Sequence, residues 1–210
     1  MMISDLIFLA KCYHHFKEVN TRNGICEMHN HNKVAKHIVF LRGINVSGKN
    51  SIKMQDLRSL LTEAGFEEVM SYIQSGNIIL SSPLSKQEVK SAIHQLIQEK
   101  LGLDIEVFAV TGEELNQVLL NNPFQGGHEQ PNKLFITFLS NQPSTDLVNK
   151  LQEKDHGQEE FQLINNMLYF YLPEGMAKSK MNNSYFEKAL KVKATGRNLN
   201  TVQKLISLIQ

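Results

Sequence analysis

The sequence lacks any long apolar run. No stretch of about 18 consecutive apolar residues occurs, so the sequence offers no candidate for a membrane-spanning helix. The apolar segment Leu6 to Ala10 follows Asp5 and not a basic region, which is not the pattern of a secretory signal. The formal net charge is only +1, so no field of the whole molecule attracts nucleic acid or an anionic membrane. We therefore expect a cytoplasmic protein in which any basic site is local.

Cysteine is scarce as well. Cys12 and Cys26 are the only two, too few for a disulfide framework, and both lie in residues 1–36 with four of the eight histidines. Cys12, Cys26, His29 and His31 have the right chemistry for zinc, but their spacing matches no regular pair-and-pair pattern. We therefore predict no metal site and no cofactor. Residues 1–36 show little apolar periodicity and are interpreted as a loosely ordered extension.

What the sequence does contain is enough apolar material for a core. Hydrophobic residues make up 41% of the 210 residues and charged residues 20%, which is typical of a globular chain. This length fits one long domain or two small ones. Met28 is an alternative start of translation, so whether residues 1–27 belong to the native protein stays open.

Periodic patterns begin at His37. A short apolar run suited to a buried strand is followed by apolar residues at helical spacing from Met54 to Ala64. Two strand-like runs then flank Ser75-Gly76, which indicates a hairpin, and Ser85 with Glu88 forms a capping box before the next helix. A last strand covers residues 104–110. The order βαββαβ is that of the ferredoxin-like unit.

The same order recurs after a bridge. Residues 133–140, 161–164 and 167–172 are expected to be strands, with helices near 147–151 and 184–190, a short strand at 191–195 and a final helix. The predicted fold class is α+β, a tandem pair of ferredoxin-like (βαββαβ) units with antiparallel sheets and a C-terminal helix. The predicted domains are a loosely ordered extension (1–36), a first ferredoxin-like unit with a glycine loop (37–110), a bridging helix and linker (111–132), and a second unit with the C-terminal helix (133–210).

Three segments resemble the DUF1697 family, a family of unknown function. They are FLRGINVSGKNSIKMQDLRSLLTEAGFEEVMSYIQSGNIILSS, NNPF and KATGRNLNTVQKL, and the resemblance covers about residues 37–210. It implies a soluble bacterial protein with paired ferredoxin-like units and no established activity. Ser47 stands where glycine is commoner in the family. Leu199 stands where tryptophan is common, which removes an aromatic surface that could stack on a ligand.

The segment RGINVSGKN raises the question of a phosphate-binding P-loop. Gly43, Gly48 and Lys49 fit the spacing G-x-x-x-x-G-K, but Asn50 replaces the Ser or Thr whose hydroxyl would hold magnesium. None of the candidate strands is followed at once by the acidic metal partner, and the expected topology is not the alternating α/β sheet of such NTPases. We therefore predict no P-loop NTPase.

We nevertheless predict an anion site at this loop, and the expected topology indicates which residues lie near it. A strand order of 4-1-3-2 brings the loop beside the Ser75-Gly76 turn. The equivalent edge of the second unit carries Ser140 to Pro143 and Asn165-Asn166, with no cation and no glycine. We expect a small phosphate- or carboxylate-bearing ligand, nucleotide-like by preference and not hydrolysed. The predicted ligand-binding residues are Arg42, Gly43, Asn45, Gly48, Lys49, Asn50, Gln74, Ser75, Asn77, Arg197 and Asn198. The alternative is that the glycines only permit a turn and the asparagines only cap backbone groups.

Two other functions remain open. RNA or DNA binding is suggested by the run LFITFL, by Tyr169 and Tyr171, and by a basic stretch from Gly175 to Lys204 with seven Lys or Arg against one acid. A protein-interaction scaffold that uses sheet edges is the other. His94, His128 and His156 are not placed beside a nucleophile by any spacing, so we name no catalytic residue, and whether the protein is an enzyme stays open.

Overall fold

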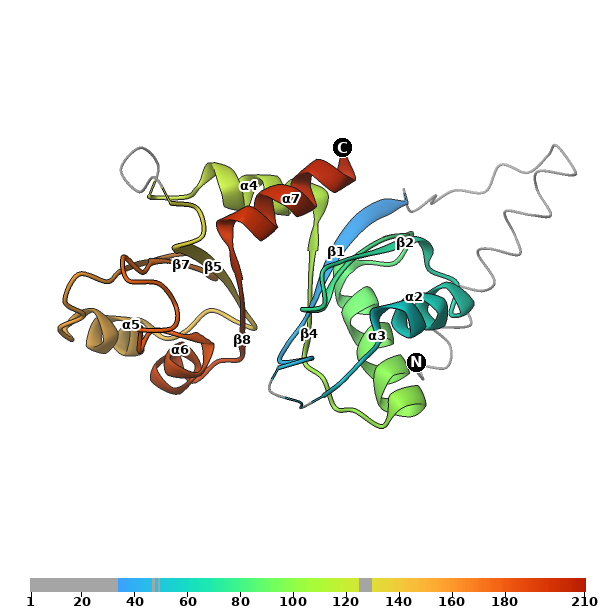
Figure 1. Cartoon of the computed structure of the whole chain (residues 1–210), viewed down its shortest axis with the longest axis horizontal. Coiled ribbons are helices and arrows are strands. Elements are labelled where there is room, and N and C mark those ends of the chain that lie inside the picture. The colour runs from blue at the N-terminus through green and yellow to red at the C-terminus, as the bar shows by residue number, and fades with distance from the viewer. Residues whose placement is uncertain (1–33, 47, 49, 125–129) are drawn as a thin grey trace, which may run out of the picture. The chain divides into compact units, whose positions relative to one another are not determined.

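The structure is a computed structural model that describes residues 34–46, 48, 50–124 and 130–210. Among these residues it has two four-stranded antiparallel sheets and six helices, a mixed α+β architecture (Figure 1). The described residues divide into two compact units, the first ending at Gly112 and the second beginning at Glu113. Nearly all of the predicted extension, including Cys12, Cys26, His29 and His31, lies outside the described residues.

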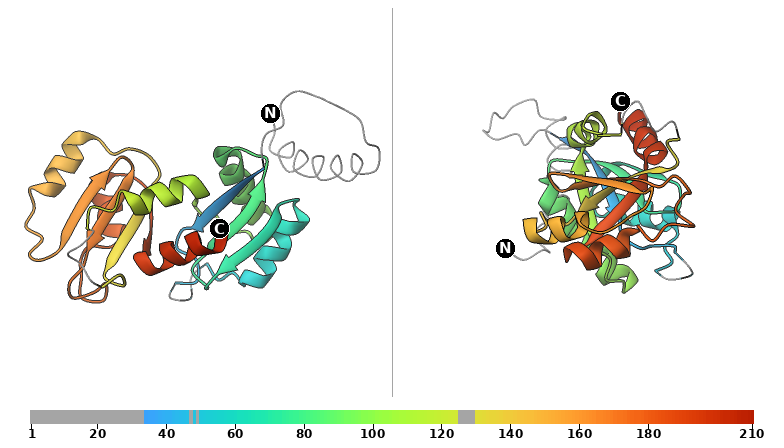
Figure 2. Two further views of the ribbon diagram at one scale, coloured as in Figure 1. Left: turned by 90° about the horizontal axis from the view of Figure 1, so that it is seen from above. Right: turned by 90° about the vertical axis from the view of Figure 1, so that its left-hand side faces the viewer.

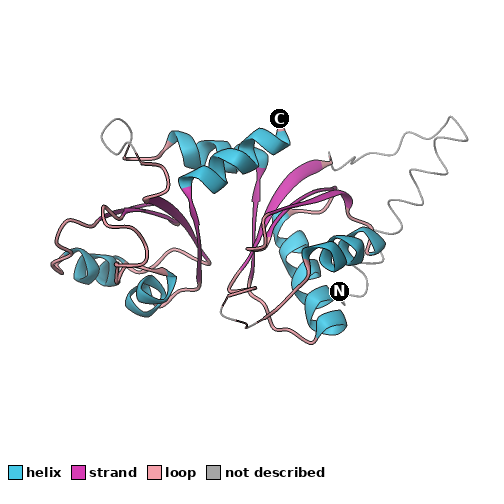
Figure 3. Cartoon of the chain, viewed as in Figure 1, coloured by secondary structure: helices cyan, strands magenta, loops and turns pink. Residues whose placement is uncertain are grey.

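The first unit is one sheet with two helices packed on the same face (Figure 3). Its elements are β1 (Ala35–Leu41), α2 (Met54–Glu63), β2 (Glu67–Tyr72), β3 (Asn77–Ser82), α3 (Lys86–Leu101) and β4 (Val107–Thr111), with the sheet in the order β2-β3-β1-β4. Leu57 of α2 and Ile93 of α3 pack in one cluster with Val39 and Ile78 of the central strands. The predicted capping box at Ser85 is present and starts α3.

The second unit has helices on both faces of its sheet (Figures 1 and 2). Its elements are α4 (Gly112–Leu120), β5 (Leu134–Leu139), α5 (Thr145–Gln152), β6 (Glu160–Ile164), β7 (Met167–Tyr171), α6 (Asn183–Leu190), β8 (Ala194–Asn198) and α7 (Leu199–Ile209), in the sheet order β6-β7-β5-β8. Leu151 of α5 and Phe186 of α6 pack with Phe170 of β7. On the opposite face the Tyr169 hydroxyl donates to the Val118 carbonyl of α4, at 2.8 Å.

Several element boundaries differ from the predicted ones, among them the start of β4 at Val107 instead of residue 104. For two others the backbone shows the reason. The hairpin turn contains Ile73 to Gly76, not only Ser75-Gly76, because Ile73 leaves β2 with a φ of +52°. The last strand is Ala194–Asn198 and not 191–195, because Lys191 takes a left-handed conformation with a φ of +55° as it ends α6. Local turn conformations of this kind are not visible in apolar periodicity.

No helix in the described part of the chain combines the length and the apolar character that crossing a membrane requires.

Candidate functional site

The loop between β1 and α2 lies against the hairpin turn between β2 and β3. The Leu41 amide, at the end of β1, donates to the Gly76 carbonyl at 2.9 Å. The Asn45 side-chain amide donates to the Gln74 carbonyl at 2.7 Å. The structure therefore brings together the two segments that contain most of the predicted site residues, because β1 and β3 are neighbours in the sheet.

Asn45 fixes the position of this loop. Its Nδ2 atom donates to the carbonyls of Gln74 and Ile52, and its Oδ1 atom accepts from the Ile52 amide at 2.9 Å. Its φ is +53°, a conformation that asparagine tolerates better than most residues. The side chain therefore links the start of the loop, where Asn45 itself lies, to the end of the loop at Ile52 and to the hairpin turn at Gln74.

The other asparagines also bind backbone groups. Asn77 is fully buried, and its Nδ2 atom donates to the Tyr72 carbonyl at 3.1 Å and to the Ser75 hydroxyl at 3.0 Å. The Asn50 Nδ2 atom donates to the Gly43 carbonyl at 3.3 Å across the loop. These contacts fit the alternative in which the asparagines cap backbone groups, and a direct contact of any of them with a ligand stays a prediction.

Gly76 is the point of closest approach between turn and loop. Its φ is +75°, and a Cβ atom there would lie 2.8 Å from the Leu41 Cβ atom and 2.9 Å from the Ile44 Cδ1 atom. Two features therefore require glycine at this position, the positive φ and the lack of space for a Cβ atom. Gly43 and Gly48 also have positive φ values, +66° and +75°, but open space surrounds them.

Much of the loop between β1 and α2 is exposed to solvent. Gly43, Gly48 and Asn50 are exposed, whereas Arg42 is half-buried and its amide donates to the Glu106 carbonyl at 3.0 Å. Lys49, the second predicted cation, lies outside the described residues, as does Ser47. The loop leads into α2, whose first residues receive no side-chain cap from Lys53. The positive end of the α2 dipole therefore adjoins the loop.

Arg197 and Asn198 belong to the second unit. Arg197 lies in β8 opposite Ile136 and is 9% exposed, and its guanidinium donates to the Thr195 hydroxyl and the Gly196 carbonyl. Burial lowers the pKa of this guanidinium to about 10. Asn198 caps α7 by accepting from the Thr201 amide at 2.9 Å. Both side chains have structural contacts in this unit. Their role in binding a ligand at the loop of the first unit stays a prediction.

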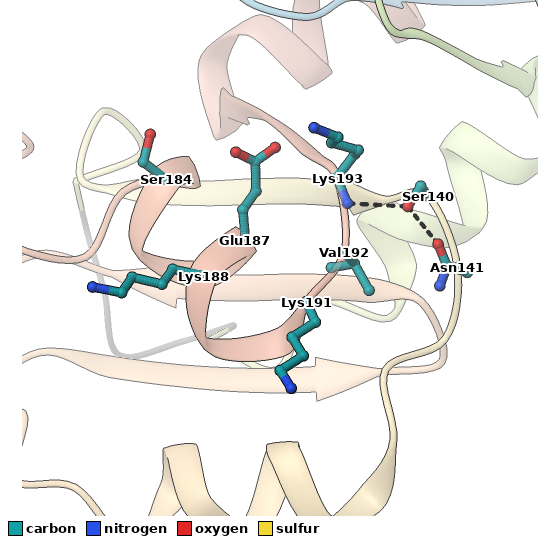
Figure 4. A pocket seen from close by; sticks show the side chains of 8 residues that line it. All are labelled: Ser140, Asn141, Ser184, Glu187, Lys188, Lys191, Val192 and Lys193. Atoms are coloured by element: carbon teal, nitrogen blue, oxygen red, sulfur yellow. Dashed lines mark hydrogen bonds between the residues drawn. The ribbon is translucent and has the colours of Figure 1, made fainter.

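The equivalent sheet end of the second unit is basic, which sequence reasoning missed. Ser140 follows β5 as Arg42 follows β1, and its amide donates to the Lys193 carbonyl at 2.9 Å, as that of Arg42 does to Glu106. The expectation that this edge has no cation is therefore wrong. Lys193 lies beside Ser140 because β5 pairs with β8. No pattern within residues 140–143 could predict this neighbour. A cavity of about 560 Å³ lies at this point (Figure 4).

The aromatic residues considered for base stacking mostly fill the core. Phe138, Tyr169 and Phe170 are at most 2% exposed, and the Phe135 ring stacks on Phe170 with centroids 5.3 Å apart. These rings are therefore not a platform for bases. Among the described residues no group of three His, Cys, Asp or Glu side chains could hold a metal.

His94 and His156 have structural partners. His94 Nδ1 lies 2.8 Å from the Ile105 carbonyl, and its Nε2 lies 3.5 Å from Asp104. His156 Nε2 lies 3.0 Å from the Tyr185 hydroxyl. His128 lies outside the described residues.

Comparison with known proteins supports the fold and identifies the family. The chain is similar to a solved structure, that of the conserved bacterial protein SP0830 from Streptococcus pneumoniae, with a TM-score of 0.68 and 22% sequence identity over 84% of this chain and 99% of that chain. No curated protein matched the sequence. Residues 34–169 match the family "Protein of unknown function (DUF1697)", a range that contains the whole glycine loop and the hairpin turn but ends before the C-terminal segment KATGRNLNTVQKL. The chain therefore belongs to the DUF1697 family.

Proposed function

We propose that the β1–α2 loop binds a small ligand that bears phosphate or carboxylate groups, nucleotide-like by preference, without hydrolysing it. The observation that carries this proposal is a difference between the two units at the same position of the sheet. The connection from β1 to α2 runs from residue 42 to 53, whereas that from β5 to α5 runs only from residue 140 to 144. A short connection is therefore enough to join these elements, and the longer loop is available for another role.

The conformation of the longer loop suits an anion. Gly43, Asn45, Gly48 and Asn50 all have positive φ values, which turn backbone amides away from the regular directions of a strand or helix. Successive amides in such turns form concave sites for anions, and the start of α2 adds a positive helix end. Arg42 and Lys49 supply the charge.

In this proposal one group of residues contacts the ligand and another group supports the loop. Arg42, Lys49 and the amides near Gly43 and Gly48 contact the ligand. Asn45 holds the loop against the turn through the Gln74 carbonyl, Asn50 bonds across the loop to Gly43, and Asn77 with Ser75 supports the turn. Absence of hydrolysis is proposed because Asn50 provides no hydroxyl for magnesium and the surrounding sheet is antiparallel, unlike that of P-loop NTPases.

Calorimetry with inorganic phosphate, ATP and a dicarboxylate tests the proposal. The wild type should bind at least one of them, and Arg42→Ala with Lys49→Ala should weaken binding by about 1–3 kcal/mol per cation, the range for charge-assisted hydrogen bonds. The matched control is Lys100→Ala with Lys150→Ala, which removes two exposed cations from other helices. If no anion binds, or both double variants bind equally, the loop is only a turn. Release of phosphate from ATP and magnesium would contradict the absence of hydrolysis.

We also infer that each unit is a ferredoxin-like unit. This is supported by the element order βαββαβ in both units and by the two sheet orders, in which the first strand lies between the third and the fourth. The cytoplasmic location and the bacterial origin stay predictions.

A further inference from the structure

The cavity at the basic sheet end of the second unit is lined by residues of three segments. Ser140 and Asn141 follow β5, Ser184, Glu187 and Lys188 belong to α6, and Lys191, Val192 and Lys193 connect α6 to β8 (Figure 4). Its volume of about 560 Å³ is within the usual range for ligand sites. All three segments belong to the second unit, whereas the β1–α2 loop belongs to the first.

Positive charge dominates this lining. Lys188, Lys191 and Lys193 contribute three ammonium groups, and Glu187 is the one carboxylate. The Glu187 carboxylate accepts from the Ala194 amide at 2.8 Å, so it has a structural task. Within the described part of the chain, none of the three ammonium groups is paired with a carboxylate. Each of the three can therefore pair with an anion from outside the chain.

The backbone that holds the lysines is fixed. The Lys193 amide donates to the Ser140 hydroxyl at 3.1 Å, and the Lys193 carbonyl accepts from the Ser140 amide at 2.9 Å. Lys191 is held in the left-handed conformation that ends α6. The negative end of the helix dipole explains the presence of Lys188 and Lys191 near this terminus, but Lys193 lies beyond the helix and needs another explanation.

The directions of the side chains indicate the kind of anion. In Figure 4 the side chains of Lys188, Lys191 and Lys193 extend in three different directions. One compact phosphate cannot contact three diverging ammonium groups, whereas successive phosphates along an extended strand can. We propose that this cavity and its three lysines bind the phosphate backbone of single-stranded nucleic acid. Because Phe138, Tyr169 and Phe170 are buried and cannot stack on bases, the contacts are electrostatic and show little preference for base.

The salt dependence of binding to a labelled oligothymidylate, followed by fluorescence anisotropy, tests this proposal. Each phosphate contact on a single strand contributes a slope of about −0.7 to log K against log salt. Three contacts give a slope of about −2, which is a loss of about 20-fold in affinity from 50 to 200 mM salt. Lys188→Gln with Lys191→Gln and Lys193→Gln should remove most of this slope.

A control variant with the same loss of charge distinguishes the effect of this site from the effect of the total charge of the protein. Lys100→Gln with Lys150→Gln and Lys204→Gln removes three exposed lysines, two of them in the last turns of other helices, and should bind the strand as the wild type does. Equal binding by the two triple variants, or no binding by the wild type at low salt, would overturn the proposal. Displacement of the strand by ATP at the same phosphate concentration would also overturn it, in favour of a small-ligand site. Equal melting temperatures of the two variants exclude unfolding as the cause of a difference.

Discussion

The side-chain amide of Asn45 donates a 2.7 Å hydrogen bond to the backbone carbonyl of Gln74, 29 residues further along the chain. The same amide group donates to Ile52, and its oxygen accepts from Ile52. One side chain thus ties the end of the glycine loop to its beginning and to the hairpin turn. Asn45 thereby fixes the backbone near both ends of the loop relative to the hairpin turn, and a fixed backbone is a requirement for a preorganised anion site.

Asn45→Ala should destabilise the protein by about 2–4 kcal/mol, because it removes three hydrogen bonds of about 1 kcal/mol each and leaves partly buried backbone groups without partners. Asn50→Ala is the matched control, since Asn50 has a similar φ of +48° and donates one hydrogen bond of 3.3 Å. Urea denaturation should show a difference of at least about 1 kcal/mol between the two variants. Equal losses would mean that Asn45 does not fix the loop.

Gly76→Ala should destabilise the first unit by about 2–4 kcal/mol, because a left-handed conformation costs about 1–2 kcal/mol and the new methyl group overlaps Leu41 and Ile44. Gly48→Ala has the same φ of +75° but meets no atom within 4 Å, so only the conformational part, about 1 kcal/mol, should appear. Thermal and urea unfolding measure both. A Gly76→Ala protein as stable as Gly48→Ala would show that the turn and β1 separate more easily than the structure indicates.

Tyr169→Phe should change the dependence of stability on alkaline pH. Burial raises the pKa of Tyr169 to about 12, so the neutral phenol contributes stability that is complete below pH 10 and is lost as the pH rises toward 12. At neutral pH the variant should be less stable by about 1 kcal/mol, because the hydrogen bond to Val118 is lost. Urea unfolding between pH 10 and 12 should show this deficit shrinking. A constant deficit across that window would contradict the buried phenol as its cause.

Asp56→Asn should strengthen anion binding at the glycine loop, if the loop binds an anion as proposed. Asp56 is exposed in the first turn of α2, where its negative charge opposes that of a ligand at the same helix end. The gain should be about 0.3–1 kcal/mol at low ionic strength and should decrease with salt. Glu63→Gln, in the last turn of the same helix, is the control and should leave affinity unchanged. Calorimetry with the anion that binds the wild type best provides the measurement.

The elements with strong local signals were predictable. The second strand of the first hairpin, Asn77–Ser82, and the capping box at Ser85 agree with the structure residue for residue, because a short apolar run next to a turn and helix capping both depend on neighbours in the chain. The contact between the glycine loop and the hairpin turn followed from the strand order. The detail of that contact did not: Ile73 leaves the strand early, and the asparagines of the loop bind backbone groups whose positions depend on the whole turn.

By itself, the sequence determined which segments become strands and helices and that glycine and asparagine gather at one end of the first sheet, since these depend on spacing over a few residues. Only the tertiary structure decided what those residues contact. Ser140 and Lys193 are 53 residues apart and meet because β5 pairs with β8, and this pairing turns a scattered run of lysines into the lining of a cavity. Contacts between distant segments depend on strand order and register, which no local pattern of residues records.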